Sequence, residues 1–340
     1  MAKRVPLAIT MGCPVGIGPE IILKYFAARP DGQSILHPLV VIGDANVLNR
    51  CSRELDISVP VIAWNPGDLI QDRTIPVYSP GGSHGLDCSE LKWGKPNKET
   101  GQAMAAYIKS AVQMIQDNVF GGMITCPISK STLNMAGYEY PGHTEMLASL
   151  CGSPDYAMMM AGKKLRVTLV TIHTRLSQVS RALSSKKIVS LIRLTGQSLQ
   201  GDFGIAVPRI AVAGLNPHAG EDELFGSEEK KFIRPAVQKA QESGWDVHGP
   251  FPPDTVFFKA VDGAFDAVVC MYHDQGLIPF KLLHFADGVN VTIGLPIVRT
   301  SVDHGTAYDI AGQGKAHATS LTAAIGMAAT IADNRKLAEK

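Results

Sequence analysis

Short apolar runs alternate along the chain with longer segments whose apolar residues recur at helical spacing. The short runs are rich in valine and isoleucine, as expected of strands that are buried on both faces. This alternation is typical of an α/β protein in which helices cover both faces of a mainly parallel sheet. The predicted strands are residues 5–9, 38–42, 122–125, 167–172, 210–215, 267–271 and 289–293.

Helix signals complete this pattern. A glycine-rich turn follows the first strand, and Pro19 with Glu20 indicates that a helix begins there. Residues 227–243 form a second predicted helix with Ser227 as its N-cap, and Pro235 inside it predicts a kink or a break. Residues 64–98 are rich in Gly, Pro, Asp and Ser and are predicted to form a loop with one short strand.

Length and charge narrow the class of protein. A chain of 340 residues exceeds the size at which one core usually keeps growing, so we expect two packed domains with a deep cleft. The formal charge of +1 gives no basic footprint for nucleic acid or for an anionic membrane. No apolar stretch approaches the roughly 20 residues that span a bilayer, and the amino terminus lacks a signal-peptide core. We therefore expect a soluble, cytoplasmic protein.

The most informative feature is the position of three histidines. His173, His218 and His273 each lie at or just past the carboxyl end of a predicted strand. In an open parallel sheet, ligands bind at that edge. Three imidazoles that meet there would hold a divalent ion and leave coordination positions open for a substrate. Spacing alone leaves open the alternative that the three are unrelated and satisfied by backbone hydrogen bonds.

Carboxylates stand next to two of these histidines. Asp274 and Glu221 are each placed to orient an imidazole or to take a proton. Helix capping is the alternative role, and it is as well supported for Glu221 as a role in the site. Lys130, which follows a predicted strand, is either a surface lysine or a cofactor contact.

Other segments predict anion binding. Residues 10–20 join a strand to a helix, so their backbone amides and the helix dipole favour an anion. Their glycines do not match the dinucleotide fingerprint, and a tight structural turn is an equal alternative. Residues 142–145, with Lys281, Asn290 and Arg299, supply the cations and hydrogen-bond donors that a phosphate or carboxylate requires.

Seven segments together closely resemble the 4-hydroxythreonine-4-phosphate dehydrogenase family, including its 4-phospho-D-threonate and 4-phospho-D-erythronate dehydrogenases. The resemblance runs over nearly the whole chain. Its motifs are TMGCPVGIGPE (10–20), YPGHTE (140–145), NPHAGE (216–221), GPFPPDTVF (249–257), YHDQGLIPFK (272–281), GVNVTIGLP (288–296) and RTSVDHGTAYDIAGQGKA (299–316).

The resemblance implies a homodimer of two-domain α/β/α subunits, similar to isocitrate and isopropylmalate dehydrogenases, with an active site in the interdomain cleft that the second subunit completes. It places the first domain at 1–140 plus 300–340, and the second, with the metal ligands and dimer contacts, at 141–299. His173, His218 and His273 match the divalent-metal ligands. The positions that match substrate contacts are His143, Thr144, Lys281, Asn290 and Arg299, and Gly16 and Gly18 are expected to contact the cofactor.

One departure from the family concerns the glycine loop, where Cys13 replaces the usual Asp or Glu and Val15 replaces the usual Ala. The six cysteines are scattered with no CxxC pair, and most are expected to be reduced core residues. Cys13 is the exception, because the nearby helix start is expected to lower its pKa and make it reactive.

The expected reaction is oxidation of the carbon-3 alcohol of 4-phosphooxy-L-threonine by NAD or NADP, with loss of CO₂ from the 3-oxo acid. Zn, Co, Mn or Mg would be the metal, and Asp274, Asp254 and Lys130 are the candidate proton acceptors in that order. 4-Phospho-D-threonate or 4-phospho-D-erythronate is the alternative substrate. A metal-dependent hydrolase and a phospho-metabolite sensor without turnover are the rivals from other classes.

Overall fold

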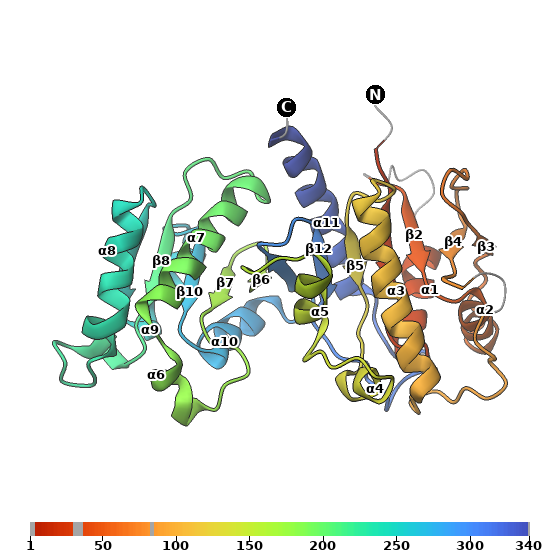
Figure 1. Cartoon of the computed structure of the whole chain (residues 1–340), viewed down its shortest axis with the longest axis horizontal. Helices are drawn as coiled ribbons and strands as arrows, with labels where there is room; N and C mark the ends of the chain where they lie inside the picture. Colours follow the sequence, from red (N-terminus) through yellow and green to blue (C-terminus); the bar gives the residue numbers. More distant parts are fainter. Residues whose placement is uncertain (1–3, 30–36, 82–84, 339–340) are drawn as a thin grey trace. The chain divides into compact units, whose positions relative to one another are not determined.

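The computed structural model describes residues 4–29, 37–81 and 85–338 of the chain. The chain divides into two compact units, one formed by 1–154 with 295–332 and the other by 155–294 with 333–340 (Figure 1). The sequence had placed these divisions at 140/141 and 299/300. The segment around His143 and residue Arg299 therefore belong to the first unit and not to the second.

The first unit contains a parallel sheet of strand order β3-β4-β2-β1-β5-β12. Its strands are β1 (Leu7–Thr10), β2 (Leu39–Ile42), β3 (Val61–Ala63), β4 (Ile75–Tyr78), β5 (Met123–Thr125) and β12 (Arg299–Val302). Its helices are α1 (Gly18–Ala27), α2 (Ala45–Glu54), α3 (Lys98–Gln116), α4 (Lys130–Met135), α5 (His143–Leu150) and α11 (Thr319–Ala338), the last of which it shares with the other unit.

The second unit is built on strands in the order β11-β6-β7-β10-β8-β9, in which only β6 runs antiparallel to its neighbours. The strands are β6 (Ala157–Ala161), β7 (Arg166–Leu169), β8 (Ile210–Ala213), β9 (Val247–Phe251), β10 (Ala267–Cys270) and β11 (Val289–Ile293). Four short segments, η1 (Leu176–Gln178), α6 (Val179–Ala182), η2 (Pro217–Gly220) and η3 (Glu229–Ile233), accompany the helices α7 (Ser185–Gly201), α8 (Arg234–Glu242), α9 (Pro253–Val261) and α10 (His273–His284).

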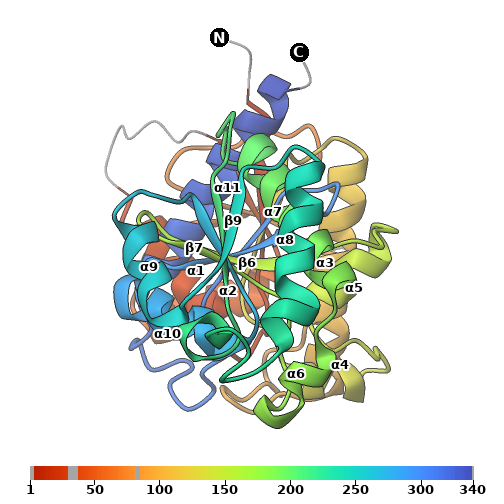
Figure 2. The same ribbon diagram turned by 90° about the vertical axis from the view of Figure 1, so that its left-hand side faces the viewer.

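Helices lie on both sides of the strands in the second unit. Figure 2 shows α7 and α8 on one side and α9 and α10 on the other. Side chains from β7, β8 and β10 pack with α9 and α10 into a buried apolar cluster that includes Val167, Val268, Leu277 and Phe280. The mainly parallel α/β class predicted from the sequence is therefore confirmed.

All seven predicted strands are present, with boundaries that differ by up to three residues. The predicted loop at 64–98 does contain one short strand, β4. The helix predicted at 227–243 is present as the π-helical turn η3, which passes directly into α8. Ile233 and Arg234 both have helical backbone angles, so the helix changes type before Pro235 without the predicted break. The predicted side-chain cap by Ser227 is absent, because no side chain caps this helix, although the Ser227 carbonyl accepts from the Lys231 N–H at 2.9 Å.

The described part of the chain contains no helix that is both long enough and apolar enough to cross a membrane. Its longest helices carry polar residues along their length. The apolar segment at 321–332, predicted to be a packed helix, lies within α11 and buries Leu321, Ala324, Ala328 and Ile331.

Helix α3 begins with a reciprocal pair of side-chain hydrogen bonds. The Asn97 side chain accepts from the Thr100 backbone N–H at 2.9 Å, and the Thr100 hydroxyl oxygen accepts from the Asn97 N–H at 2.9 Å. Two amides that have no partner within the helix are thereby satisfied.

We predict that Asn97→Ala lowers the free energy of unfolding by about 1 kcal/mol, because it removes the acceptor of this cap. Asn97→Ser, which restores a short side-chain acceptor, should recover most of the loss. Urea unfolding followed by circular dichroism measures both. Equal midpoints for the alanine and serine variants would show that the cap does not stabilise α3.

Candidate active site

Strand pairing brings the three histidine-bearing segments to one edge of the second unit. β10 pairs in parallel with β7 on one side and with β8 on the other. His173 lies four residues beyond the end of β7, His218 five beyond β8 and His273 three beyond β10. The order β7-β10-β8 therefore places the His273 segment between the other two.

Two of the histidine rings lie close together. The centroids of the His173 and His273 imidazoles are 6.2 Å apart, with an angle of 34° between the rings. With nitrogen–metal distances of about 2.0–2.1 Å and tetrahedral angles, two imidazoles on one ion have ring centres roughly 5 Å apart. This pair is about 1 Å wider than that, so a small rotation of the side chains would bring both rings to one divalent ion.

A carboxylate orients one of these rings. His273 Nδ1 lies 2.7 Å from Asp274 Oδ1, and both side chains are well exposed. The ionised carboxylate can only accept, so Nδ1 carries the proton and Nε2 keeps a lone pair. This pairing of a carboxylate with a histidine is the usual outer support of an imidazole ligand.

His218 stands in an unusual backbone conformation. Every residue from His218 to Glu223 has a positive φ, between 39° and 86°, and only Gly220 among them lacks a side chain. Runs of this kind are sparsely populated by L-residues and occur where surrounding contacts hold them. The His218 ring contacts the Phe225 ring at a centroid distance of 6.0 Å.

Residues 4–29, 37–81 and 85–338 contain no group of three His, Cys, Asp or Glu side chains arranged to hold a metal ion. The structure thus brings together His173 and His273 and leaves His218 on the neighbouring segment. The three-histidine set stays a prediction.

The first unit contributes a buried guanidinium. Arg299, the first residue of β12, is 3% exposed, and its Nη2 donates to Thr125 Oγ1 at 2.8 Å. Burial lowers the pKa of Arg299 to about 10, although the Glu145 carboxylate opposes this shift. The planar fork of guanidinium donors matches the oxygens of a carboxylate or a phosphate, so this residue type suits an anionic group.

The start of α5 lies beside this arginine. His143 is partly buried, and its Nε2 atom is enclosed with no hydrogen-bond partner among the described residues. Burial, together with the Arg299 charge, lowers the pKa of His143 well below its usual value. Lys130 lies next to the same segment, because its Cε would be 3.4 Å from a Cβ added at Gly142.

The remaining predicted site residues of the second unit lie on three elements. Lys281 is on α10, the helix that His273 begins, and Asn290 is on β11. The Asn290 Oδ1 atom is buried without a hydrogen-bond partner among the described residues. Asp254 is exposed in the first turn of α9, which packs against η2, the turn that contains His218.

The glycine loop is enclosed by its neighbours. Gly18 begins α1, and a Cβ added there would lie 2.0 Å from the Met11 carbonyl oxygen. Gly16 packs against Thr306, and the Ile17 N–H donates to the Thr306 carbonyl at 3.1 Å. Close packing explains glycine at position 18, so the role of Gly16 and Gly18 in cofactor binding stays a prediction.

The expectation of a reactive Cys13 was wrong. The Cys13 thiol is buried, and this burial raises its pKa, although a hydrogen bond from the Tyr308 hydroxyl at 3.3 Å acts in the opposite direction. Loss of thiolate solvation raises the pKa of Cys13 more than the nearby start of helix α1 lowers it. All six cysteines lie in the described residues and are free thiols.

Two polar networks that sequence reasoning missed hold the loops around this glycine turn. The buried Glu20 carboxylate accepts from the N–H groups of Gly314 and Ala316, while Lys24 donates to the carbonyls of the same two residues. The sequence indicated this role only in that Glu20 belongs to one of the family motifs, because its partners lie 294 and 296 residues away in the chain.

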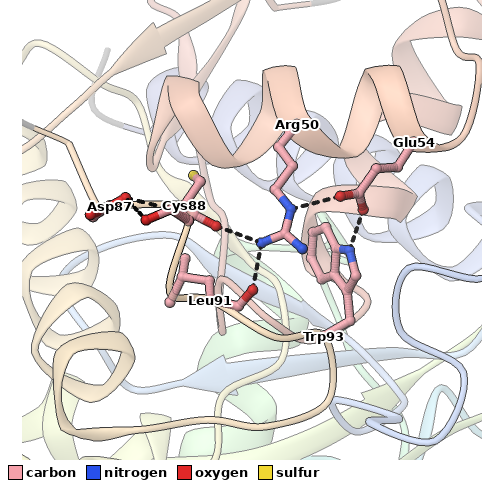
Figure 3. A network of polar contacts seen from close by, with 7 residues as sticks. Arg50, Glu54, Asp87, Cys88, Leu91 and Trp93 are labelled. Atoms are coloured by element: carbon pink, nitrogen blue, oxygen red, sulfur yellow. Dashed lines mark hydrogen bonds and ion pairs between the residues drawn. The ribbon is translucent and has the colours of Figure 1, made fainter.

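Figure 3 shows the second network. Arg50 on α2 donates to the carbonyls of Cys88 and Leu91, and Glu54 accepts from Arg50 and from the Trp93 indole N–H. The Gly94 N–H that follows donates to the Val15 carbonyl, so this loop supports the glycine turn.

A cavity of about 1110 Å³ in the first unit is not part of the site. It is lined by residues that precede or begin strands, such as Pro6, Leu39, Thr74 and Val119. It therefore opens at the amino-terminal ends of the strands, whereas ligands of parallel sheets bind at the carboxyl ends.

We predict that Cys13 resists labelling by Ellman's reagent in the folded protein, because its thiol is buried and its pKa is raised. Cys88 and Cys151, which are partly exposed, should react first. Mass spectrometry of the labelled peptides reads out the order. If Cys13 were labelled before Cys88 and Cys151, the original expectation that Cys13 is reactive would hold.

We also predict a pH effect from His143. Its folded-state pKa is depressed, so the unfolded chain binds a proton that the folded chain does not once the pH falls below about 6.5. Wild-type stability should therefore fall between pH 7 and pH 5, and His143→Gln should lose less over this range. The exposed His317→Gln is the control. Equal losses in all three proteins, measured by urea unfolding, would contradict the assignment.

Comparison with known proteins identifies the family to which the chain belongs. Residues 34–328 match the family model described as "Pyridoxal phosphate biosynthetic protein PdxA". A protein of Desulfosudis oleivorans named 4-hydroxythreonine-4-phosphate dehydrogenase is 53% identical, with 96% of each chain covered. A protein of Salmonella typhimurium named D-threonate 4-phosphate dehydrogenase is 43% identical, with 96% of this chain and 98% of that protein covered.

A solved structure agrees with these matches. The crystal structure of 4-hydroxythreonine-4-phosphate dehydrogenase from Klebsiella pneumoniae superposes with a TM-score of 0.88 at 40% identity, covering 97% of this chain and 100% of that one. Both matches extend over the two units. The family model begins at residue 34, so it leaves out the amino-terminal loop and includes the other motifs of the predicted site. The chain belongs to the 4-hydroxythreonine-4-phosphate dehydrogenase family.

Proposed function

We propose that the chain oxidises carbon 3 of 4-phosphooxy-L-threonine with NAD or NADP, in the presence of a divalent metal, as a step of pyridoxal phosphate synthesis. The 3-oxo acid then loses CO₂ to give 3-amino-2-oxopropyl phosphate. The observation that carries this proposal is the pair of imidazoles, His173 and His273, 6.2 Å apart at the carboxyl edge of the second unit. Membership of a family of dehydrogenases supports the reaction class. The proposal includes a cytoplasmic location.

The metal ligands in this proposal are His173, His218 and His273. The ring spacing of the first and third, and the Nδ1 proton that Asp274 holds on His273, support it. When bound at these residues, a divalent ion would supply Lewis-acid activation of the alcohol, and nicotinamide would supply the hydride acceptor. Three protein ligands suit Zn, Co or Mn, and Mg is the further candidate.

The residues of the first unit hold the anionic ends of the substrate in this proposal. The buried Arg299 guanidinium and the unpartnered Nε2 of His143 support this role, with Thr144 following on α5. Lys281 and Asn290 act from the second unit, where the buried Asn290 Oδ1 also has no hydrogen-bond partner among the described residues. Fixing both ends of the substrate sets the position of carbon 3 relative to the cofactor.

The residue that accepts the proton of the substrate alcohol is proposed from its position in the structure. Asp274 already accepts from His273, and this contact supports the orienting role. Asp274 stays the first candidate for proton acceptor, followed by Asp254, at the start of the helix that packs on η2, and by Lys130, next to the start of α5. A lysine acts in this way only in its neutral form.

A homodimer is part of the proposal, supported by an apolar stripe on α10 and its C-cap residue Phe285. Ile278, Leu282 and Phe285 recur at helical spacing and are 68%, 85% and 82% exposed. Monomeric proteins rarely expose neighbouring large apolar side chains in this way. A second copy seated on this stripe would lie along the helix that carries His273 and Lys281.

4-Phospho-D-threonate is the second candidate substrate, because a relative named for that activity is 43% identical over nearly the whole chain. A metal-dependent hydrolase and a sensor without turnover are the remaining alternatives. A hydrolase would release phosphate without reducing the cofactor, and a sensor would bind without either change.

We predict that NAD or NADP is reduced when the protein is mixed with a divalent metal and 4-phosphooxy-L-threonine. The absorbance of the reduced cofactor should rise faster than with 4-phospho-D-threonate, since the relative at 53% identity carries the first name and the one at 43% the second. A faster rate with the threonate would reverse the order of the two substrates. Phosphate release alone would favour the hydrolase.

We predict that His218→Ala abolishes turnover and leaves the fold largely intact, because the side chain is exposed and stabilises no core. His248→Ala, which changes another exposed histidine of the same unit, is the matched control and should retain the wild-type rate. A His218→Ala protein with near-normal rates, or a wild-type rate that survives chelation of metal, would remove His218 from the mechanism.

A further inference from the structure

A chain of buried hydrogen bonds crosses the three strand ends that carry the histidines. Thr171, two residues before His173, directs both its N–H (3.2 Å) and its hydroxyl (2.8 Å) to the carbonyl of Met271. Met271 in turn stands two residues before His273. The segments after β7 and β10 are therefore joined just ahead of the two imidazoles.

One side chain makes the next connection. The Gln275 side chain accepts from the Met271 N–H through Oε1 at 2.7 Å and donates to the Gly214 carbonyl through Nε2 at 2.6 Å. Gln275 is 7% exposed, so its carboxamide is a buried group with both ends satisfied. The N–H donor and the carbonyl acceptor also fix which way the amide points.

This amide stands where the backbone ladder between two strands ends. β10 and β8 pair directly up to Val269 and Val212. Met271 and Gly214 lie two residues beyond this last pair, each one residue past the end of its strand. Here the Gln275 carboxamide takes the place of a direct hydrogen bond between the two backbones. The inserted amide therefore sets how far apart the two strands stand as they lead to His273 and His218.

The segment beyond Gly214 is held in the same manner. The carboxylate of Glu229, which is 2% exposed, accepts from the N–H groups of Leu215 and Asn216 at 2.8 Å and from Asn216 Nδ2 at 2.9 Å. The left-handed backbone begins only two residues later, at His218. The polar chain thus extends from the His173 segment to the His218 segment.

We propose that Thr171 and Gln275 are positioning residues of the metal site, which set the spacing of the three histidine-bearing segments. We call these two side chains, with the Met271 backbone and the Gly214 carbonyl, the strand-end relay. The inference rests on the proposed three-histidine site. A metal tolerates errors of only a few tenths of an ångström in its ligands, so loss of the relay weakens binding without removing any ligand.

The test is a titration of the full-length protein with Co²⁺, followed by its visible absorption bands, which report ligand number and geometry. Gln275→Met removes both hydrogen bonds of the amide at similar size, and Thr171→Val removes the hydroxyl at similar shape. We expect each to weaken Co²⁺ binding about 10- to 100-fold, the usual effect of losing an outer support of a metal ligand, and to alter the bands.

Two variants serve as controls. Thr171→Ser restores the hydroxyl and should return binding to the wild-type value. Thr195→Val breaks the buried hydrogen bond between the hydroxyls of Thr168 and Thr195, 3.0 Å long, in the same unit. It removes a comparable interaction outside the relay, so Co²⁺ binding should not change. If Gln275→Met does not fold, Gln275→Glu keeps the acceptor for Met271 but cannot donate to Gly214, and the same loss is expected.

The outcomes separate this inference from the proposed function. Wild-type Co²⁺ affinity and bands in Gln275→Met and Thr171→Val, combined with loss of binding in His218→Ala, would overturn the relay and leave the metal site standing. Equal weakening by Thr195→Val would reduce the effect to general destabilisation and also overturn it. Absence of histidine-dependent Co²⁺ binding in the wild-type protein would remove the metal site, and the relay with it.

Discussion

The parallel pairing of β10 with β7 and with β8 is the constraint on which the site depends. Parallel strands end at the same edge, so residues that lie 61 positions apart, as Gly214 and Gln275 do, or 100 apart, as Thr171 and Met271 do, become neighbours there. Because backbone pairing stops at that edge, side chains must satisfy the polar groups beyond it. Thr171, Gln275 and Glu229 do so, and each is almost fully buried.

The two units supply different chemistry. The second unit presents imidazoles with exposed edges and one supporting carboxylate, a donor set suited to a divalent ion. The first unit presents a buried arginine and a histidine that burial keeps neutral, which together suit an anionic group. Its glycine turn is fixed by Glu20 and by the loop that Arg50 and Glu54 hold. Substrate oxidation in our proposal needs both sets.

Much of the fold could be predicted from the sequence, because runs rich in Val and Ile mark strands such as β1, β2 and β10. Strands with other compositions were missed: β6 reads AMMMA, and β9 contains glycine and proline. The histidine positions followed from strand ends, but residues such as Gln275 could not be recognised, since their partners are fixed only by folding. The Cys13 prediction failed because local sequence shows a helix start and not the burial that outweighs it.

The most direct test of the account is X-ray absorption spectroscopy of the zinc-loaded protein at the metal edge. We predict three imidazole ligands with nitrogens at about 2.0–2.1 Å, recognised by the scattering of their rings, and oxygen ligands in the remaining positions. Loss of one imidazole in the His218→Ala protein would identify the third ligand. A wild-type spectrum with two imidazoles or fewer, unchanged by that substitution, would contradict the convergence of the three histidine-bearing segments on one ion.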